Sequence, residues 1–397
     1  MSYTFPPAPI NASGLAAARA PFGHSRMLPA EAYLSQSVLD WEREFFLDST
    51  WVCAGRSADV SEPKCQKAIK VGHTSVLLSR DADGVLHVFA NICRHRGHEL
   101  LPCGASAIRG VIQCPYHAWT YELSGELRIA PHFGDVPNFD QANLGLVTVR
   151  HAEWNGWVFV NVSGNAPNFL DHVDALDRIF ANYELHRLLP AATHEYVLEA
   201  NWKLAIENYQ ECYHCPLIHP ELCRVSEHSS GDNYNYTGDA GLWVGGTMDL
   251  EDFAATMSLD GASGGEVLRG LNDQQRRQVD YIGVFPNLLV SLHPDYVMTH
   301  TLTPLTPTST HVECQWLFAP ESISKPGFDP AYASDFWHLT NGQDWAAVQS
   351  VQRGMQSPKY VPGLLADNED AVYQWVSLIA SGYAGERMSR GSTIMRA

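Results

Sequence analysis

The fold is decided by the stretch "CRHRGHELLPCGASAIRGVIQCPYHAWTY", residues 93–121. It contains two tight pairs, Cys93-x-His95 and Cys114-x-x-His117, with 18 residues between them. Thiolate and imidazole side chains in such pairs hold a structural zinc ion or an iron–sulfur cluster. Four unrelated loop residues are the remaining alternative, and the regular spacing of the four in a β-rich window weighs against it.

The composition of each pair favours one kind of metal site. Each pair mixes one cysteine with one histidine, whereas zinc sites of the finger type place their two pairs on a hairpin and a helix. In a Rieske centre, two cysteines hold one iron of a [2Fe–2S] cluster and two histidines hold the other. The sequence therefore predicts four cluster ligands, with zinc as the alternative: Cys93, His95, Cys114 and His117.

Short β-strand patterns surround this motif. Between Trp51 and Ser163, runs such as "TSVLLSR" and "GWVFVNV" alternate with turn signals such as "DADG". We expect residues 48–165 to form a small all-β domain. Residues 1–47 are predicted to form an N-terminal arm that ends in a helix over 36–47.

The rest of the chain, residues 166–397, is expected to form a larger α+β domain with an antiparallel sheet. A strand runs into a helix within "HEYVLEANWKLAIENYQECYH", and Pro216 is expected to end that helix. Residues 231–275 are rich in Gly, Asp and Ser and are predicted to form long loops. Other predicted elements occupy these ranges: helix 168–185, antiparallel strands 287–318, and helices 334–355 and 368–381.

Composition and charge exclude some partners. The chain has 26 Lys and Arg against 44 Asp and Glu, a net charge of −18, which argues against nucleic acid and anionic membranes as partners. We see no apolar run of transmembrane length and no signal peptide, so we expect a cytoplasmic protein. The nine cysteines are an odd number, and we expect reduced thiols and metal ligands instead of a disulfide framework.

A second metal site is indicated by "ENYQECYHCPLIHPEL", residues 207–222. On one continuous helix His214 and His219 would point about 140° apart. Pro216 lies between them, so a helix that ends there lets His219 turn back toward His214. Two imidazoles and one carboxylate form the facial triad that holds Fe(II) and leaves positions open for O₂ chemistry.

The stretches "CRHRGHEL" and "CPYHAWTYELSGEL" resemble the cluster-binding loops of the oxygenase (α) component of Rieske non-haem iron oxygenases. Respiratory Rieske proteins carry an additional disulfide between these loops, and this sequence has His98 and Tyr116 in place of those cysteines. The resemblance implies a Rieske domain followed by a catalytic α+β domain of the helix-grip (START-like) type.

The resemblance also implies roles for single residues. The third iron ligand is expected to be Asp344, which we predict to open a helix after the Asn341-Gly342 turn. Glu211 is expected to link a cluster histidine of one subunit to an iron-ligating histidine of the next. Most relatives have Asp there, while the subset acting on quaternary ammonium compounds has Glu. Asn208 is expected to face the iron. Alternatives for Asp344 remain open: a helix cap at this position, or Asp335, Asp367 or Glu369 as the ligand.

Electron supply implies partners. The chain has no evident Gly-rich dinucleotide fingerprint, so NAD(P)H and flavin are expected only in a separate flavin/iron–sulfur reductase. The resemblance implies a ring-shaped homotrimer, because electrons cross a subunit boundary in the family. The oxygenases of glycine betaine, carnitine, choline and stachydrine are the most similar subset. A monooxygenase that removes an N-methyl group, with glycine betaine as substrate, is therefore the expected function.

Quaternary ammonium substrates are held by aromatic faces, because they have no N–H group to donate. Aromatic residues available for this in the second domain are Tyr209, Tyr213, Tyr234, Tyr236, Trp243, Tyr281, Phe285 and Tyr296. A carboxylated substrate would also need an Arg, Lys or His partner, which the sequence does not identify. Oxygenation of an aromatic ring is the alternative activity, and a Rieske electron-transfer protein without its own catalysis is the alternative class.

Overall fold

A computed structural model describes residues 3–134, 136–234 and 241–393. The contacts divide the chain into two compact units. One unit consists of residues 43–166, and the other combines residues 1–42 with residues 167–397. The catalytic unit, as we call the second, is therefore interrupted in the sequence by the first, which we call the cluster unit.

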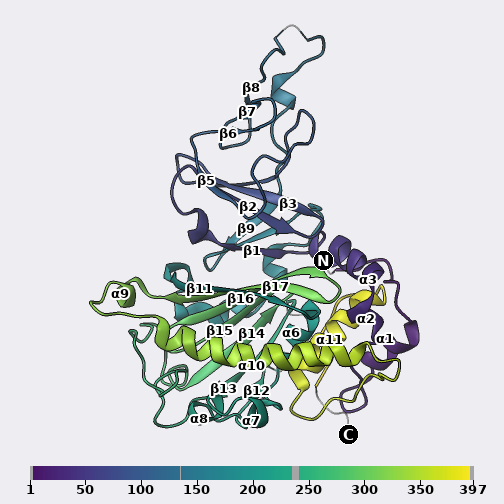
Figure 1. The fold of residues 1–397 in the computed structure, drawn as a ribbon, viewed down its shortest axis with the longest axis vertical. Coiled ribbons are helices and arrows are strands. Elements are labelled where there is room, and N and C mark those ends of the chain that lie inside the picture. The colour runs from purple at the N-terminus through teal and green to yellow at the C-terminus, as the bar shows by residue number, and fades with distance from the viewer. Residues whose placement is uncertain (1–2, 135, 235–240, 394–397) are drawn as a thin grey trace. The chain divides into compact units, whose positions relative to one another are not determined.

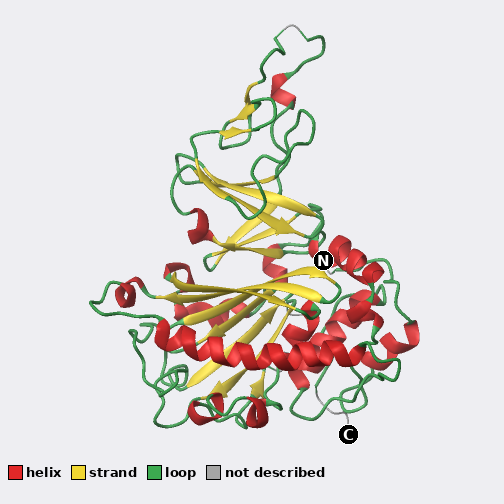
Figure 2. Ribbon diagram, in the orientation of Figure 1, coloured by secondary structure: helices red, strands yellow, loops and turns green. Residues whose placement is uncertain are grey.

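The cluster unit is all-β, as expected, with short helical turns only in the part described (Figure 2). Its strands form three small antiparallel sheets, ordered β1-β10-β9, β4-β3-β2-β5 and β6-β7-β8. The strands are β1 Val52–Arg56, β2 Cys65–Val71, β3 Thr74–Arg80, β4 Leu86–Ala90, β5 Ser106–Ile108, β6 Ile112–Gln113, β7 Thr120–Tyr121, β8 Leu127–Ile129, β9 Arg150–Trp154 and β10 Trp157–Asn161.

The catalytic unit is built on one seven-stranded antiparallel sheet in the order β11-β17-β16-β15-β14-β13-β12 (Figure 1). Its strands are β11 Leu189–Leu198, β12 Asp232–Asn233, β13 Trp243–Asp249, β14 Gln278–Val284, β15 Leu288–Leu292, β16 Val297–Thr306 and β17 Ser309–Phe318. The helices are α1 Ala12–Ala18, α2 Glu31–Leu34, α3 Gln36–Glu42, α4 Phe169–His172, α5 Leu176–Phe180, α6 Trp202–Tyr209, α7 Cys215–Ile218, α8 Leu222–Val225, α9 Pro320–Ile323, α10 Ala331–Met355 and α11 Asp370–Tyr383. This mixture of helices and one antiparallel sheet confirms the α+β fold class.

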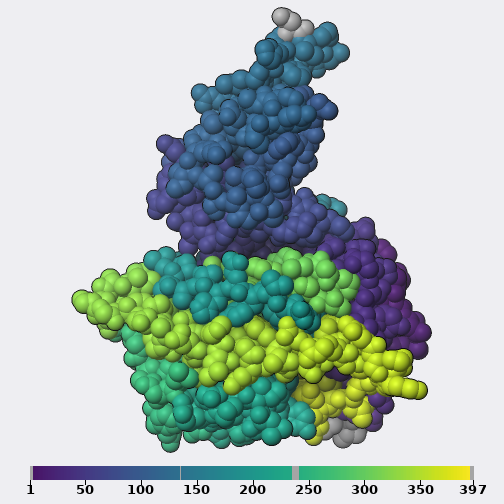
Figure 3. Space-filling model, in the orientation of Figure 1, coloured from purple at the N-terminus to yellow at the C-terminus, as the bar shows by residue number. Residues whose placement is uncertain are grey.

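The long helix α10 runs across the strands (Figure 1), and its buried residues are polar as well as apolar. Asn341 on α10 lies 3.3 Å from the ring nitrogen of His300 on β16, measured from Oδ1 to Nε2. The opposite side of α10 belongs to the surface of the unit (Figure 3), where Val351 is 47% exposed. One side of α10 can therefore carry site residues while the other faces solvent.

A buried ion pair ties the N-terminal segment to helix α6. The Nζ atom of Lys203 lies 2.5 Å from Oε1 of Glu42, and the two side chains are 0% and 1% exposed. Glu42 also accepts hydrogen bonds from Trp202 Nε1 at 2.9 Å and from the hydroxyl of Tyr383. The first residues of the chain thus support the helix that leads into the predicted iron site.

Two expectations about local structure are wrong. Residues 231–275 are not only loops, because they contain β12 and β13. Gly245 and Gly246 sit in β13 where a Cβ would come within 2.3 Å of Tyr281 O and 2.6 Å of Asp232 O, so glycine here marks close strand packing. The helix expected to end at Pro216 ends at Tyr209, and Pro216 instead occupies the first turn of α7.

The helix expected over 36–47 is confirmed, since α3 continues into a π-helical turn at Arg43–Leu47. Among the described residues, no helix combines the length and the apolar character that crossing a membrane requires.

Candidate metal centres

Two loops of matching geometry carry the four predicted cluster residues. One follows β4 and the other connects β6 to β7. In each loop the amide four residues after the cysteine donates to the cysteine carbonyl, from Gly97 to Cys93 at 3.0 Å and from Ala118 to Cys114 at 3.1 Å. Both donors have left-handed backbones, with φ of +74° at Gly97 and +57° at Ala118. These tight turns bring each Cys and its His to the same end of the loop.

The donor atoms of these loops fit an iron–sulfur cluster. His95 and His117 lie with their ring centroids 4.7 Å apart, and the buried Nδ1 of His95 has no hydrogen-bond partner. A buried ring nitrogen without a partner is unfavourable unless a ligand occupies it. Cys93 and Cys114 are 3% and 2% exposed, and burial raises the pKa of the Cys93 thiol, so cluster binding must displace its proton.

Aromatic groups hold these donors in place. His95 stacks on Trp119, with ring centroids 5.0 Å apart and planes 6° from parallel. The Tyr121 hydroxyl lies 3.2 Å from Cys93 Sγ and accepts a hydrogen bond from Arg94 N at 3.0 Å. Packing and hydrogen bonds of this kind around the first ligands orient them and tune a cluster's reduction potential.

The structure offers a compact group of donor atoms for a single metal ion at another place. Ligands of one tetrahedral zinc lie close together, at about 2.0–2.3 Å from the ion. In the part of the chain that the structure describes, one group of three or more such side chains has its ligand atoms within 4.8 Å of one another, and it lies elsewhere, in the catalytic unit. The two loops would together hold a two-iron cluster through one cysteine and one histidine each.

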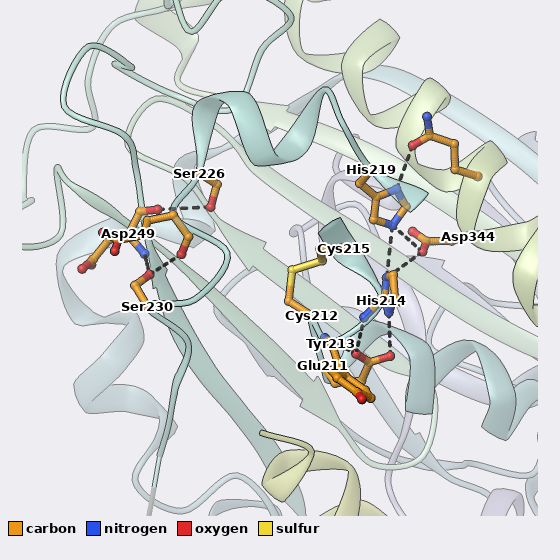
Figure 4. The surroundings of a disulfide bond; sticks show 12 residues. Glu211, Cys212, Tyr213, His214, Cys215, His219, Ser226, Ser230, Asp249 and Asp344 are labelled. Carbon is orange, nitrogen blue, oxygen red and sulfur yellow. Dashed lines mark hydrogen bonds and ion pairs between the residues drawn. A yellow bond between two sulfur atoms is a disulfide. The ribbon is translucent and has the colours of Figure 1, made fainter. Parts of the chain in front are cut away.

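That compact group is the predicted iron site: His214, His219 and Asp344 (Figure 4). The Nε2 atoms of His214 and His219 are 3.1 Å apart, and they lie 3.3 Å and 2.9 Å from Oδ1 of Asp344. His214 precedes α7, His219 follows it directly, and Asp344 comes from the middle of α10. Three donor atoms that converge on one point form the donor set of a facial triad.

The second ring nitrogen, Nδ1, of each imidazole lies within hydrogen-bond distance of a side-chain oxygen. His214 Nδ1 lies 2.6 Å from Oε1 of Glu211, and His219 Nδ1 lies 2.7 Å from Oε1 of Gln343. Because an acceptor oxygen takes the Nδ1–H of each ring, both Nε2 atoms are left to bind a metal.

The electrostatics of this group are those of a cation site. Burial lowers the pKa of His214, but its hydrogen bonds to Asp344 and Glu211 outweigh this and raise the pKa to about 9. Burial likewise opposes ionisation of Asp344, and the two imidazoles reverse the effect and lower its pKa. A metal ion would replace these imidazole protons, so its binding releases protons.

The structure corrects which elements of secondary structure hold the site residues. Glu211 does not share a helix face with His214, because α6 has already ended; Glu211 lies in the following loop. Its Oε2 accepts from the backbone amides of Tyr213 at 2.5 Å and His214 at 3.2 Å. The short loop, and not a helix, thus fixes the carboxylate against the imidazole.

Asp344 does not open a helix and is not a helix cap, since α10 begins at Ala331 and passes through Asn341 and Gly342 without a turn. Asn341 is buried there, with Nδ2 donating to the sulfur of Cys314 at 3.7 Å, so it acts as a packing residue. The competing acids lie outside the triad. Asp335 is exposed, and Glu369 accepts from the amide of Ala366 at 2.6 Å.

A disulfide between Cys212 and Cys215 brackets His214 (Figure 4). The expectation that all cysteines are reduced is therefore wrong for these two. The Cys212-x-x-Cys215 spacing in the sequence is the signal that could have identified this disulfide.

A cavity of about 470 Å³ opens beside the triad. Asn208 lines it, and so do two of the proposed aromatic residues, Tyr209 and Tyr281. The other aromatic candidates in the described chain do not line this cavity, and Tyr236 lies outside the described residues.

Sequence reasoning missed several residues of the cavity wall. Trp337 and Thr340 lie seven and four residues before Asp344 on α10, so all three share one helix face. Helical spacing could have identified them. Asp370 in the same wall carried no such signal, and neither did Gln343, which holds His219.

Comparisons with known proteins agree with this arrangement. A family model described as "Rieske [2Fe-2S] domain" matches residues 50–140, and one described as "Ring hydroxylating alpha subunit (catalytic domain)" matches residues 185–385. The chain is 27% identical to the glycine betaine monooxygenase oxygenase subunit of Pseudomonas aeruginosa over 366 residues, which cover 86% of this chain and 85% of the relative. It is 37% identical to the carnitine monooxygenase oxygenase subunit of Escherichia coli K12 over 195 residues, 49% of this chain and 52% of the relative.

Solved structures share the fold. The quaternary ammonium Rieske monooxygenase CntA in complex with L-carnitine superposes with a TM-score of 0.76 at 23% identity, covering 94% of this chain and 99% of that one. Naphthalene 1,2-dioxygenase from Rhodococcus gives a TM-score of 0.72 at 18% identity, covering 93% and 95%.

Proposed function

We propose, because this chain belongs to the family of ring-hydroxylating α subunits, that it is the oxygenase component of a two-component system acting on a quaternary ammonium compound. The chain is a Rieske-type monooxygenase, and its cofactors are a [2Fe–2S] cluster and a mononuclear iron. The observation that carries the proposal is the convergence of His214, His219 and Asp344 at one wall of a cavity that also exposes aromatic rings. The relatives named for glycine betaine and carnitine support the same substrate class.

The proposed reaction removes an N-methyl group. One N–CH₃ group, O₂, two electrons and two protons give N–CH₂OH and water. The hydroxymethyl ammonium then loses its hydroxyl proton, and its C–N bond breaks to give formaldehyde and the tertiary amine. When bound, the cluster supplies electrons singly and the iron supplies the activation of O₂.

The residues of this chain hold and orient those groups. We assign Cys93 and Cys114 to one iron of the cluster, and His95 and His117 to the other. The triad of His214, His219 and Asp344 is assigned to the mononuclear iron. Glu211 and Gln343 fix the tautomers of the two iron-binding imidazoles, so both are positioning residues. Asn208 contributes a neutral amide to the cavity wall, where it can bond to substrate or water.

A reductase partner follows from the membership in a multicomponent system. We propose that a separate flavin/iron–sulfur reductase takes hydride pairs from NAD(P)H and delivers single electrons. We also propose a homotrimer in which Glu211 lies between a cluster histidine of a neighbouring copy and His214. The Glu211 carboxylate suits this position because it already holds the imidazole Nδ1 at 2.6 Å.

The test is turnover by holoenzyme with a reductase and NADH, measured as oxygen uptake and formaldehyde release. Glycine betaine, carnitine, choline and stachydrine are compared with naphthalene and benzoate. We expect formaldehyde from at least one trimethyl or dimethyl ammonium compound in equal amount to the oxygen consumed. A cis-diol or phenol from an arene, without formaldehyde, would establish ring oxygenation instead. No oxygen uptake with any compound would leave an electron carrier.

The matched variants are Asp344→Asn and Asp335→Asn. Both residues lie on α10, but only Asp344 reaches the triad, while Asp335 is exposed. Activity lost in the first variant and kept in the second ties turnover to the iron site. Equal loss in both would mean that the helix, and not the ligand, is responsible.

A further inference from the structure

The charge of the cavity wall supports an inference about which quaternary ammonium compound the enzyme prefers. This inference rests on the proposed function. Five carboxylates line the cavity, and its lining contains no Arg or Lys. Among the described residues that line the cavity, a substrate carboxylate would therefore meet acids and no permanent cation.

Two of these five carboxylates are already matched by the iron site. Asp344 belongs to the triad, and Glu211 holds His214. The two charges of an Fe(II) ion in the triad would offset both. The remaining three, Asp232, Asp367 and Asp370, have no ion-pair partner among the residues described.

These three acids come from two segments that meet at the cavity. Asp232 is in β12, Asp367 precedes α11 and Asp370 begins it. Burial, together with the charge of Asp232 nearby, raises the pKa of Asp370, whereas hydrogen bonds from Asn233 and from backbone amides oppose that effect. Carboxylates that are close to one another and lack a cation favour a positively charged ligand.

An aromatic wall lies on the same cavity. Tyr281 meets Tyr209 and Trp337 edge to face, with ring centroids 5.7 Å and 6.4 Å apart. The Tyr281 hydroxyl is buried and has no hydrogen-bond partner in the described structure. Ring faces and a phenol oxygen present negative potential to a trimethylammonium group, which is the chemistry of cation–π recognition.

We infer that the cavity selects a quaternary ammonium cation whose other end is uncharged, such as an alcohol or an amide, over one that ends in a carboxylate. The neutral end would find amide and hydroxyl groups in the wall, including those of Asn208 and Thr247. The remaining imidazole of the lining, His228, is not a permanent cation and does not replace an arginine for binding a carboxylate. The inference reverses the expectation that glycine betaine is the preferred substrate.

The test compares three compounds with the same trimethylammonium head: choline, glycine betaine and betaine amide. Betaine amide has the shape of glycine betaine and lacks only its negative charge. With holoenzyme, reductase and NADH, kcat/KM from formaldehyde release is expected to be at least about tenfold higher for choline and betaine amide than for glycine betaine. Binding to the reduced holoenzyme without O₂, followed by tryptophan fluorescence, should give the same order.

Variants of the acidic residues test whether the cavity wall causes the substrate preference. Asp370→Asn and Asp232→Asn should each reduce the ratio of kcat/KM for betaine amide to kcat/KM for glycine betaine. Asp335→Asn, on the exposed side of α10, should leave this ratio unchanged. If kcat/KM for glycine betaine equals or exceeds that for betaine amide, the inference is overturned, and the proposal that the enzyme removes an N-methyl group stays intact. Neither binding nor formaldehyde from any of the three compounds, with product from an arene, would overturn both.

Discussion

Removal of the Glu42 carboxylate should destabilise the catalytic unit strongly. In Glu42→Ala the ammonium of Lys203, whose side chain is 0% exposed, loses the carboxylate that lies 2.5 Å away. Loss of one partner of a buried ion pair costs about 3–5 kcal/mol, because the remaining charge stays buried and unpaired. The variant also leaves the indole N–H of Trp202 and the hydroxyl of Tyr383 without their acceptor.

Differential scanning calorimetry gives the assay. For a unit of this size each kcal/mol lowers the melting temperature by about 2–4 °C, so a decrease of about 6–20 °C is expected. The double variant Glu42→Leu/Lys203→Met removes both charges and should recover most of the loss, since apolar replacements of a buried pair are often neutral. The reasoning would be refuted if the free energy of unfolding of Glu42→Ala fell by less than about 1 kcal/mol, or if the double variant were as unstable as the single one.

Other predictions address the site and its pH dependence. Asp344→Ala should lose mononuclear iron while the visible spectrum of the cluster is retained, and unchanged iron content would point to another carboxylate. Cys93→Ala should abolish that spectrum, whereas a colourless wild type that contains only zinc would contradict the cluster assignment. Glu211→Ala should keep both metals and lower turnover by at least about 10–100-fold, because the positioning of His214 is lost, and with it the proposed link to a cluster histidine of a neighbouring copy; normal turnover would exclude both roles. Burial raises the pKa of Glu207 from 4.5 to about 8, so the folded state keeps a proton that the unfolded chain releases, and stability should fall as pH rises from about 5 to 8. Urea unfolding of Glu207→Gln should show a weaker decline over that range than wild type, and an identical decline would assign it to other groups.

The sequence was sufficient where the chemistry is local. Cys93 and His95 share one loop, and Cys114 and His117 share another, so spacing alone indicates which four residues form one candidate cluster site. The β-strand patterns between the two loops were equally readable, because alternation depends on neighbours in the chain.

Element boundaries were harder, because tertiary contacts decide them. Helix α6 stops at Tyr209 although "QECYH" could continue a helix, and the side chain of Glu211 instead accepts the loop amides. Asn341 and Gly342 resemble a turn, yet α10 passes through them because Asn341 finds partners on the sheet. Such partners, far away in the sequence, cannot be read from propensity.

The cavity wall was the least predictable part. Trp337, Tyr281 and Asp370 come from α10, β14 and α11, and only the folded sheet brings them to one surface. The sequence offered aromatic residues in excess, and three of them, Trp243, Phe285 and Tyr296, are buried in the core.

The interruption of the catalytic unit by residues 43–166 has a consequence for synthesis on the ribosome. The inserted unit is translated whole, with all four cluster ligands, before Lys203 and α11. Glu42, already outside the tunnel, must stay without its partner until α6 follows. A nascent chain long enough for residue 166 to have left the tunnel, but halted before α10, should thus accept its iron–sulfur centre while the lobe for O₂ chemistry is still unbuilt, which separates the loading of the two metals in time.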